Sequence, residues 1–372
     1  MNKKTIAVVF GGRSPEYDVS LNSANSVINA INKEKFEIIL IGITNTGEWY
    51  RYFGDVSNIP SDNWHTDKKM IKKAALSPSR GEGLLEFESG FADALQNKTK
   101  APSEVGHNLV TATKVDIIFP VLHGKNGEDG TIQGLCELAG IPVVGSGTLA
   151  SALCMDKVRS YKIVDQAGIK VPKYIYYEQM PAEAEVLSDV SGFKLPIFVK
   201  PVKAGSSFGV TKVEKLDEIY DAIKYAYEFD DAVVIEQGVV GKELGCAVFE
   251  NPELKTGRVD VIDVEKGFFD YEEKYSLKTA KIHMPARISE EAEKRVSETG
   301  KKIFKLLGCK GYARVDMFLN EQQEVIFNEI NTIPGFTAFS RFPNMCKGIG
   351  MSFEQLVDKL IETALNSGTG AA

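Results

Sequence analysis

Apolar runs alternate with helically spaced apolar residues along the first part of the chain. The run Thr5–Phe10 predicts a buried strand, and after a Gly-Gly turn apolar residues recur at helical spacing over Val19–Ile31. Further strands are predicted at Phe36–Thr44, at Val115–Leu122 and, more briefly, at Ile141–Val144. Strands that alternate with helices are typical of a mainly parallel sheet, so the pattern predicts an α/β fold.

The hydrophobic pattern fades between residues 55 and 110, where polar residues dominate. This region contains the lysines Lys68, Lys69, Lys72 and Lys73. A basic patch that binds a ligand and a plain solvated face both fit such a run, and we favour the solvated face.

The rest of the chain divides into two further blocks. The second block is predicted to contain a helical segment at Ala150–Gln166, a strand that ends at Lys200 and an amphipathic helix that starts at Leu216. The third is predicted to contain the strand Ala232–Glu236, a long helix that ends at Gly308, the β segments Ala313–Leu319 and Glu324–Asn331, and a last helix that opens with the capping-box pattern Ser352-Phe-Glu-Gln355. We predict domains at residues 1–145, 146–235 and 236–366, followed by a frayed tail at 367–372.

The composition limits the partners and the compartment. The 372 residues include 44 Lys and Arg against 51 Asp and Glu, a formal net charge of −7, which argues against a nucleic-acid partner. Five scattered cysteines fit thiols in a reducing compartment better than a disulfide framework or a zinc module. No apolar stretch approaches the roughly 20 residues that a membrane span requires. We therefore predict a cytoplasmic protein without a membrane partner.

Two β segments near the C-terminal end bring together the side chains with the clearest chemistry. Alternation places Arg314 and Asp316 on one face of the first segment, and Glu329 and Asn331 on one face of the second. A tight turn centred between residues 322 and 323 pairs Asp316 with Glu329 and Arg314 with Asn331. Such oxygen donors suit Mg²⁺ held with nucleotide phosphates, and the guanidinium suits an oxyanion. The polar outer face of an ordinary hairpin is the alternative.

A glycine- and serine-rich loop and two acids form a second candidate group. The loop follows the strand that ends at Lys200, and its residues Ser206 and Ser207 offer donors that suit phosphates. Glu236 ends a strand and Glu243 follows shortly after, so these acids suit an adenine amino group and ribose hydroxyls. Neither the P-loop nor the Rossmann glycine motif occurs. Simple Gly-Ser turns and solubilising acids are the alternatives.

Two polar residues follow strands of the first block. Glu16 lies just after the first strand, and His123 lies at the end of the strand that contains Pro120. Ligands favour this edge of a parallel sheet, although a lone histidine is more often structural. The other three histidines have no supporting context.

Taken together and in this order, these stretches resemble the D-alanine–D-alanine ligase family, which has an ATP-grasp fold. The resemblance runs from about residue 4 to residue 365 and is interrupted only at 55–110. It implies three α/β domains, ATP bound between the second and third, two Mg²⁺ ions with Mn²⁺ as an expected substitute, and a homodimer. It also implies that D-alanine is first phosphorylated to an acyl phosphate, which the amine of a second D-amino acid then attacks.

The resemblance assigns roles to residues that match the family's motifs. For ATP these are Lys157, Lys200, Ser207, Glu236, Gly238, Val239, Glu243 and Lys274, and for the metal ions they are Asp316, Glu329 and Asn331. Glu16 and His123 would face the first D-alanine, and Ser206 and Tyr275 would link that site to a mobile lid at 264–284. Arg314, Gly335 and Ser340 would receive the second substrate and the tetrahedral oxyanion.

Two segments indicate which second substrate the enzyme accepts: the lid and the segment before Arg341. The lid sequence Glu273-Lys-Tyr275, followed by a run that ends Ala280-Lys-Ile, is similar to the vancomycin-resistance D-alanine–D-serine ligases, particularly the VanG type. The resemblance also argues against D-lactate as the second substrate, because D-lactate ligases of the family have a His in the lid instead of Tyr275. Arg341 suits a hydrogen bond to a serine hydroxyl. Phe339 departs from the family's usual Thr-Ser-His-Ser.

We therefore expect D-serine as the second substrate and keep three alternatives open. They are a housekeeping D-alanine–D-alanine ligase, an ATP-grasp ligase with another amino-acid or carboxylate substrate, and a non-catalytic ATP-grasp protein that binds or regulates.

Overall fold

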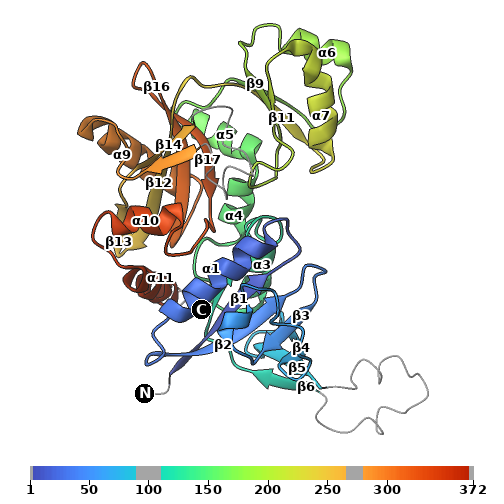
Figure 1. Cartoon of the computed structure of the whole chain (residues 1–372), viewed down its shortest axis with the longest axis vertical. Coiled ribbons are helices and arrows are strands. Elements are labelled where there is room, and N and C mark those ends of the chain that lie inside the picture. The colour runs from blue at the N-terminus through green and yellow to red at the C-terminus, as the bar shows by residue number, and fades with distance from the viewer. Residues whose placement is uncertain (1–2, 89–109, 265–279, 368–372) are drawn as a thin grey trace, which may run out of the picture. The chain divides into compact units, whose positions relative to one another are not determined.

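The structure is a computed structural model that describes residues 3–88, 110–264 and 280–367. The chain splits into two compact units (Figure 1). Unit 1 comprises Met1–Thr148, Gly335–Ser340 and Ser352–Ala372, and unit 2 comprises Leu149–Pro334 and Arg341–Met351. The division into three domains at residues 145 and 235 stays a prediction.

Unit 1 is built on a seven-stranded sheet in the order β6-β5-β4-β3-β2-β1-β7. The predicted parallel strands are confirmed, because β1 (Lys4–Gly11) pairs in parallel with β2 (Phe36–Ile43) and with β7 (Ile117–Val121). The predicted strand at 141–144 is wrong: this segment contributes one isolated bridge, between Ile118 and Val143.

Four antiparallel strands that the sequence did not predict extend this sheet, two within the polar region at 55–110 and two at its borders. They are β3 (Trp49–Tyr52), β4 (Ile71–Leu76), β5 (Leu84–Phe87) and β6 (Val110–Thr113). Lys72 and Lys73 lie on β4 and form ion pairs with Glu88 and Glu48. These pairs agree with the favoured interpretation of the lysine run as a solvated face.

Helices cover the sheet of unit 1. They are α1 (Tyr17–Ala30), α3 (Thr131–Ala139), α11 (Phe353–Ser367) and the short 3₁₀ turn η1 (Val56–Asn58). Gly11 and Gly12 both have positive φ values, of 85° and 100°, so the turn into α1 uses a conformation that favours glycine. The predicted capping box of α11 is confirmed, since Ser352 N donates to Gln355 Oε1 at 2.9 Å and Gln355 N donates to Ser352 Oγ at 3.2 Å.

Unit 2 contains two sheets, and the first is antiparallel with the order β10-β9-β11-β8. Its elements are β8 (Tyr174–Tyr177), α6 (Glu183–Asp189), β9 (Ile197–Pro201), β10 (Thr211–Val213), η2 (Leu216–Glu218), α7 (Ile219–Tyr227) and β11 (Val233–Gln237). Figure 1 shows α6 and α7 beside β9 and β11. Val199, Ile223 and Ile235 belong to the core between them.

The second sheet of unit 2 has the order β15-β14-β12-β16-β17, with β13 paired to β12. Its strands are β12 (Gly241–Asn251), β13 (Glu253–Thr256), β14 (Asp260–Val264), β15 (Ala280–His283), β16 (Tyr312–Asn320) and β17 (Val325–Asn331). The helices of this part are α4 (Thr148–Met155), α5 (Lys157–Gln166), α9 (Glu290–Leu306) and α10 (Arg341–Lys347). Val296 and Phe304 of α9 pack into the core on this sheet.

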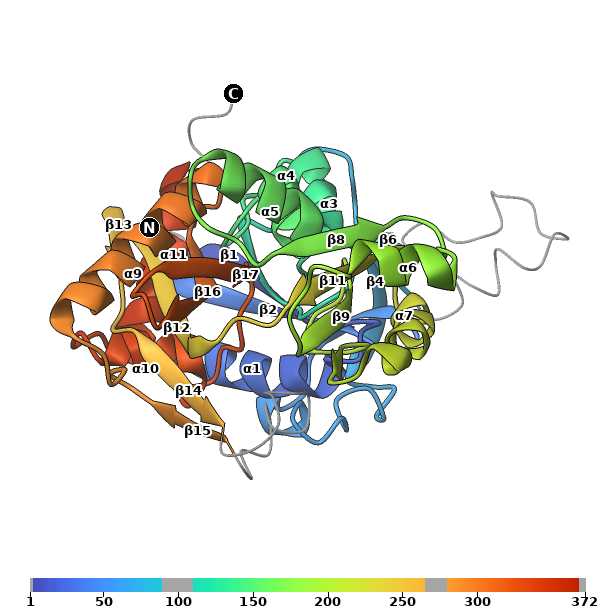
Figure 2. The same cartoon turned by 90° about the horizontal axis from the view of Figure 1, so that it is seen from above.

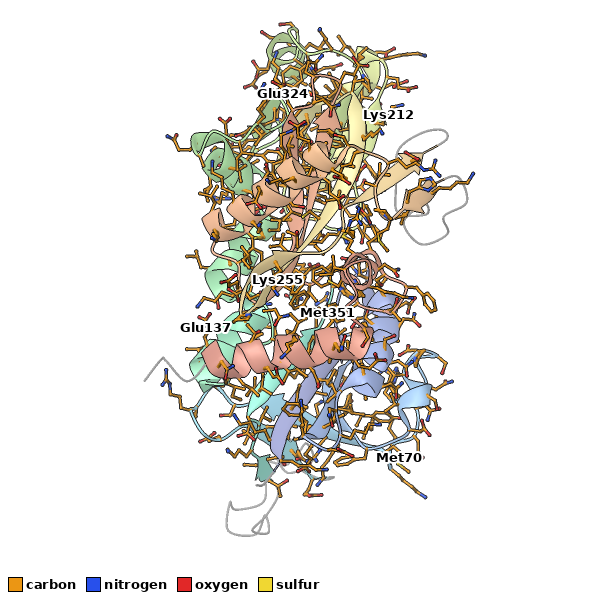
Figure 3. The ribbon with its side chains drawn as sticks, turned by 90° about the vertical axis from the view of Figure 1, so that its left-hand side faces the viewer. Met70, Glu137, Lys212, Lys255, Glu324 and Met351 are labelled. Carbon is orange, nitrogen blue, oxygen red and sulfur yellow. The ribbon has the colours of Figure 1, made fainter. Side chains whose placement is uncertain are left out.

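Strands β16 and β17 lie side by side (Figure 2), and their register confirms the two predicted cross-strand pairs. Arg314 lies opposite Asn331 and Asp316 lies opposite Glu329, but beyond them Met317 pairs with Phe327. Asn328 is therefore the extra residue of a β-bulge. The turn runs from Asn320 to Glu324, which is labelled in Figure 3, so its centre lies at residue 322 rather than between 322 and 323. The extra residue of the bulge offsets this shift of the turn, so the two predicted pairs still form.

Two further predictions concern membranes and cysteines. Within the described ranges, no helix combines the length and apolar character that crossing a bilayer requires. All five cysteines are buried, and none of them forms a disulfide bond. The thiols therefore agree with the expectation that no disulfide framework supports this fold.

Candidate active site

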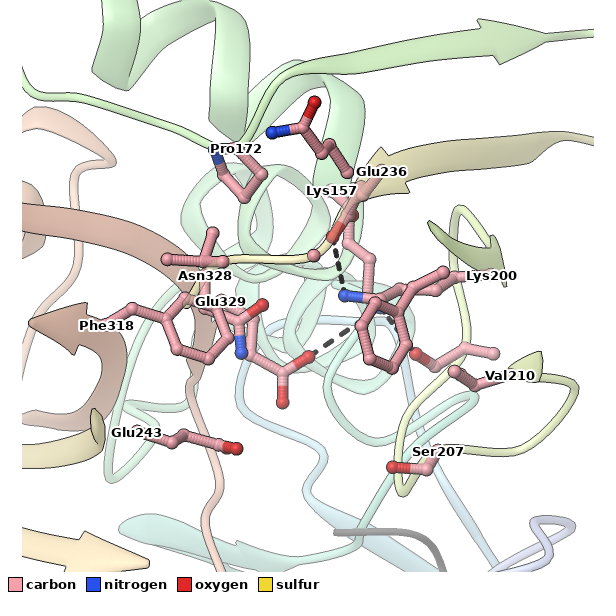
Figure 4. Close-up of a pocket in the computed structure, with 15 residues that line it drawn as sticks. Lys157, Pro172, Lys200, Ser207, Val210, Glu236, Glu243, Phe318, Asn328 and Glu329 are labelled. Atoms are coloured by element: carbon pink, nitrogen blue, oxygen red, sulfur yellow. Dashed lines mark hydrogen bonds and ion pairs between the residues drawn. The ribbon is translucent and has the colours of Figure 1, made fainter. Parts of the chain in front are cut away.

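A pocket in unit 2 lies between its two sheets and gathers most of the residues predicted to bind ATP (Figure 4). Its lining is Lys157, Pro172, Phe198, Lys200, Ala204, Ser207, Val210, Glu236, Gln237, Gly238, Val239, Glu243, Phe318, Asn328 and Glu329. Seven of these were predicted for ATP and one, Glu329, for metal. The pocket thus joins apolar and aromatic walls to a charged end, which suits a ligand with a flat ring and an anionic tail.

The charged end is organised around Glu236, which is 3 % exposed at the end of β11. Lys200 Nζ donates to Glu236 Oε2 at 2.6 Å, and Tyr161 Oη donates to Oε1 at 2.9 Å. Burial by itself lowers the pKa of Lys200, but the carboxylates of Glu236 and Glu329 outweigh it and raise the pKa above its ordinary value. Lys200 therefore presents a permanent positive charge to the pocket.

Lys157 supplies the second cation and is the first residue of α5. The helical segment predicted at 150–166 is in fact two helices, because the Asp156 side chain accepts from Arg159 N and caps α5. This break points Lys157 into the pocket, where its Nζ donates to Ala204 O at 2.7 Å and lies 3.8 Å from Glu329 Oε2.

The loop between β9 and β10 carries the two predicted serines. Ser206 and Ser207 have positive φ values, of 49° and 60°, a conformation that is uncommon for residues other than glycine. Strained backbone of this kind concentrates at ligand-binding sites. Ser207 lines the pocket and Ser206 is its neighbour in the loop.

Four residues form a row across the second sheet of unit 2, and we call them the transverse row. Asp260 on β14 pairs with Gly245 on β12, Gly245 pairs with Asp316 on β16, and Asp316 pairs with Glu329 on β17. Residues directly opposite one another share one face of an antiparallel sheet. The row therefore sets three carboxylates on one face, and the glycine leaves space between two of them.

Two arginines neutralise the buried end of the transverse row. Arg314 donates from Nε and Nη2 to Asp316 at 2.7–3.0 Å. Arg341 donates from Nε and Nη2 to Asp260 at 2.8 and 2.7 Å, and its Nη1 lies 3.5 Å from Asp316 Oδ1. Burial alone lowers the pKa of Arg341, but Asp260 and Asp316 outweigh it and raise the pKa. Both guanidinium groups therefore stay charged while buried.

The predicted metal ligands fit Mg²⁺ by their donor chemistry. Asp316, Glu329 and Asn331 offer hard oxygen atoms, and Glu329 lines the pocket. Asn331 Nδ2 and Arg314 hold the Asp316 carboxylate in place. In the part of the chain that the structure describes, no three His, Cys, Asp or Glu side chains gather as a metal site by themselves. Further ligands would therefore come from phosphate oxygens and water, as Mg²⁺ commonly requires.

Substitution of Gly245 by alanine tests the packing of the transverse row. A Cβ atom at this position would overlap Arg341 Nη2 and would lie 2.5 Å from Asp260 Oδ1. We expect Gly245→Ala to lower the free energy of unfolding by about 1–3 kcal/mol in urea denaturation, since overpacking displaces a buried ion pair.

Gly134→Ala is the matched control for this substitution. Gly134 lies within α3, and the nearest atoms to an added Cβ would be 3.7 Å away. Because alanine favours helices, this control should hold or raise stability. Equal unfolding midpoints for Gly245→Ala and the unmodified protein would contradict the close approach of Arg341 and Asp260 to Gly245.

Two of the predicted D-amino-acid residues in unit 1, Glu16 and His123, follow the adjacent parallel strands β1 and β7. Glu16 precedes α1 and is 8 % exposed, and His123 follows β7 and is 3 % exposed. An added Cβ atom at Gly124 would meet the Glu16 carboxylate, so these two neighbouring strand ends are close. Ser340 Oγ accepts from Thr337 N at 3.0 Å, and an added Cβ at Gly335 would lie 3.3 Å from the same oxygen.

Two predicted residues, Lys274 and Tyr275, lie outside the described residues, as does most of the predicted lid. The described strands β14 and β15 pair antiparallel on either side of that segment. The roles of residues 274 and 275 therefore stay predictions.

Sequence reasoning missed several residues of this site, among them the lining residues Phe198 and Phe318 and three polar residues. Asp260 is the bidentate partner of Arg341, Tyr161 orients Glu236, and Asn328 reaches the pocket through the bulge. Gly245 offered a signal, because a glycine inside a strand often marks a close approach of other groups. Tyr161 and Asp260 carried no comparable signal, since their partners are far away in the chain.

Comparisons with known proteins agree with this arrangement. Residues 5–146 match the family described as the D-ala D-ala ligase N-terminus, and residues 163–362 match the D-ala D-ala ligase C-terminus. The crystal structure of the VanG D-Ala:D-Ser ligase from Enterococcus faecalis is 51% identical, covers 98% of this chain and 100% of that chain, and superposes with a TM-score of 0.86.

Curated relatives include both resistance and D-alanine–D-alanine ligases. The vancomycin/teicoplanin A-type resistance protein VanA of Enterococcus faecium is 42% identical over 373 residues, which are 98% of this chain and 99% of VanA. The D-alanine–D-alanine ligase of Acetivibrio thermocellus is 40% identical over 374 residues, which are 98% of this chain and 96% of the relative.

The chain therefore belongs to the D-alanine–D-alanine ligase family of ATP-grasp enzymes, which use ATP and generally Mg²⁺. This membership confirms both the resemblance and the predicted fold class. The relatives differ in their second substrate, so membership alone leaves that substrate open.

Proposed function

We propose that this protein joins D-alanine to a second D-amino acid, preferentially D-serine, at the expense of ATP. The product would serve as a peptidoglycan precursor that lowers vancomycin affinity. The observation that carries the serine preference is the buried ion pair between Arg341 and Asp260. The strong likeness to a D-Ala:D-Ser ligase supports the same assignment.

ATP is assigned to the pocket of unit 2. Phe198 and Phe318 provide apolar surface for the adenine ring, and Gly238 and Val239 line the same pocket. Glu243 suits the ribose hydroxyls. Lys157 and Lys200 suit the phosphates, because both ammonium groups reach the charged end of the pocket.

The chemistry requires an activated carboxylate, because a carboxylate does not react with an amine. In the proposed first step, the D-alanine carboxylate attacks the γ-phosphorus, ADP leaves and D-alanyl phosphate forms. Lys157 and Lys200 stabilise the charge that spreads over the transferring phosphoryl group. When bound at Asp316, Glu329 and Asn331, Mg²⁺ would neutralise further phosphate charge. Glu16 and His123 are the residues assigned to the first D-alanine.

In the second step the amine of the acceptor attacks the acyl carbonyl, and phosphate leaves. Arg314 is assigned to the tetrahedral oxyanion, since its Nε and Nη2 are fixed by Asp316 and its Nη1 can donate to the reacting oxygen. A fixed donor gains most in a buried site, where little reorganisation accompanies the reaction.

The serine preference is assigned to Arg341. Asp260 fixes its Nε and Nη2 in a bidentate pair, so the remaining Nη1 has a defined direction beside Asp316. A site that hydrogen-bonds a substrate hydroxyl discriminates strongly against the analogue that lacks it. D-alanine differs from D-serine by that hydroxyl alone.

Competition between acceptors tests the proposal. We expect phosphate release at neutral pH to be faster with D-alanine plus D-serine than with D-alanine alone, with kcat/KM for D-serine as acceptor about tenfold higher or more. Equal values would reject the serine preference and leave a D-alanine–D-alanine ligase. ATP binding without any D-alanine-dependent ADP formation would instead favour a binding or regulatory protein.

A further inference from the structure

Helix α1 buries a polar stripe where helices usually bury apolar side chains. Glu16 immediately precedes the helix, and Ser20 and Ser23 follow at positions i+4 and i+7, so all three lie on one face. The two serines are 0 % exposed. Buried hydroxyls require hydrogen-bond partners, so the partners show what the stripe holds together.

Ser20 links α1 to the adjacent strands β1 and β7. Its Oγ accepts from Gly11 N, at the end of β1, at 2.8 Å, and donates to Val121 O, at the end of β7. Both partners are backbone groups. Ser20 therefore holds together the ends of the two strands that lead to Glu16 and His123.

Ser23 has partners of a different kind. Its Oγ lies 3.1 Å from His123 Nε2 and accepts from Phe336 N at 3.2 Å. Phe336 is 1 % exposed and packs against Phe119 and Phe353, with ring centroids 6.0 and 5.6 Å apart. One buried hydroxyl thus joins segments that are 100 and 313 residues away in the chain.

The donors and acceptors of this link are compatible. The Phe336 N–H can only donate, so the Ser23 oxygen accepts there and keeps its own proton for His123 Nε2. With the opposite histidine tautomer, Nε2 donates to the second lone pair of the same oxygen. The link therefore persists in either tautomer.

We infer that Ser23 is a positioning residue that aligns the two D-amino-acid subsites with each other. It holds the imidazole assigned to the first D-alanine and the main chain beside Gly335, which is assigned to the second substrate. The turn that follows is rigid, because Ser340 N donates to Thr337 O at 3.0 Å and the two hydroxyls lie 2.9 Å apart. This inference rests on the proposed function of these residues.

The experiment compares Ser23→Ala and the nearly isosteric, weakly hydrogen-bonding Ser23→Cys with the unmodified enzyme. We expect KM to rise about tenfold for both the first D-alanine and the second D-amino acid. KM for ATP should change less than about twofold, because the ATP pocket lies in unit 2. Ser26→Ala is the matched control, since the Ser26 hydroxyl bonds only to Asn22 O of the same helix in the described structure, and we expect it to leave all three constants unchanged.

A readout independent of activity separates this inference from the proposed function. The chain has four histidines, so ¹⁵N-histidine spectra of the full protein can resolve His123. We expect its Nε2 resonance to move in both Ser23 variants and to stay in place in Ser26→Ala. Unchanged amino-acid KM values together with an unmoved resonance would overturn the inference. An enzyme without D-alanine-dependent turnover would overturn the proposed function even if the resonance moved.

Discussion

Glu329→Gln is expected to reduce kcat by about 10³-fold while leaving the fold intact. Glu329 lies opposite Asp316 and 3.8 Å from Lys157 Nζ, so the substitution removes one charge from the group assigned to Mg²⁺ and phosphate. The amide keeps the size of the side chain, which is 24 % exposed and therefore tolerates the change. Steady-state ADP formation over a Mg²⁺ titration measures the effect, and a higher Mg²⁺ requirement should accompany the lower kcat.

Glu324→Gln is the control on the same hairpin. Glu324 pairs with Lys170 at 2.5 Å at the β16–β17 turn, outside the pocket lining. This control should keep kcat within about twofold, because exposed ion pairs contribute little. Near-normal turnover in Glu329→Gln would reject the metal assignment, whereas equal losses in both variants would indicate damage to the hairpin rather than to the site.

The double variant Arg341→Met with Asp260→Asn is expected to lose the preference for D-serine. Removal of both charges avoids the large penalty of one buried, unpaired partner. A hydrogen bond between a charged donor and the acceptor hydroxyl contributes about 1.5–3 kcal/mol, so the D-serine to D-alanine ratio of kcat/KM should fall about 10–100-fold. Ligation of two D-alanines should continue, because the variant retains Arg314 and Glu329.

Arg258→Met with Glu293→Gln controls for the loss of an ion pair in the same unit. Arg258 forms a similar bidentate pair with Glu293, at 2.8 and 3.0 Å, but its side chain is 41 % exposed. We expect no change in acceptor preference there. If the Arg341 and Asp260 double variant still prefers D-serine, other residues determine the acceptor specificity and the assignment to Arg341 is wrong.

The hairpin shows how far sequence reasoning reaches for this fold. Alternation on each strand and a short connection were enough to pair Asp316 with Glu329 and Arg314 with Asn331. The turn position and the bulge at Asn328 were not predictable, because they depend on the left-handed conformation of Gln323, with φ of 60°, and on packing in the sheet. These two differences cancel at the site and leave an additional side chain in the pocket.

Other features depend on tertiary pairing and escaped prediction. Strands β3 to β6 are short, and they form because each pairs with a neighbour that extends the sheet from β2. The segment at 141–144 has the composition of a strand, yet only Val143 bridges to β7. Asp260 became a site residue only through its register with Gly245.

Mass spectrometry of a single reaction tests the central claim most directly. The purified protein is supplied with ATP, Mg²⁺, D-alanine labelled with ¹⁸O in its carboxylate, and an equal concentration of D-serine at neutral pH. The account predicts D-alanyl-D-serine as the main dipeptide and one ¹⁸O atom in the released phosphate, since the acyl phosphate transfers a carboxylate oxygen. Unlabelled phosphate, or D-alanyl-D-alanine as the main product, would contradict it.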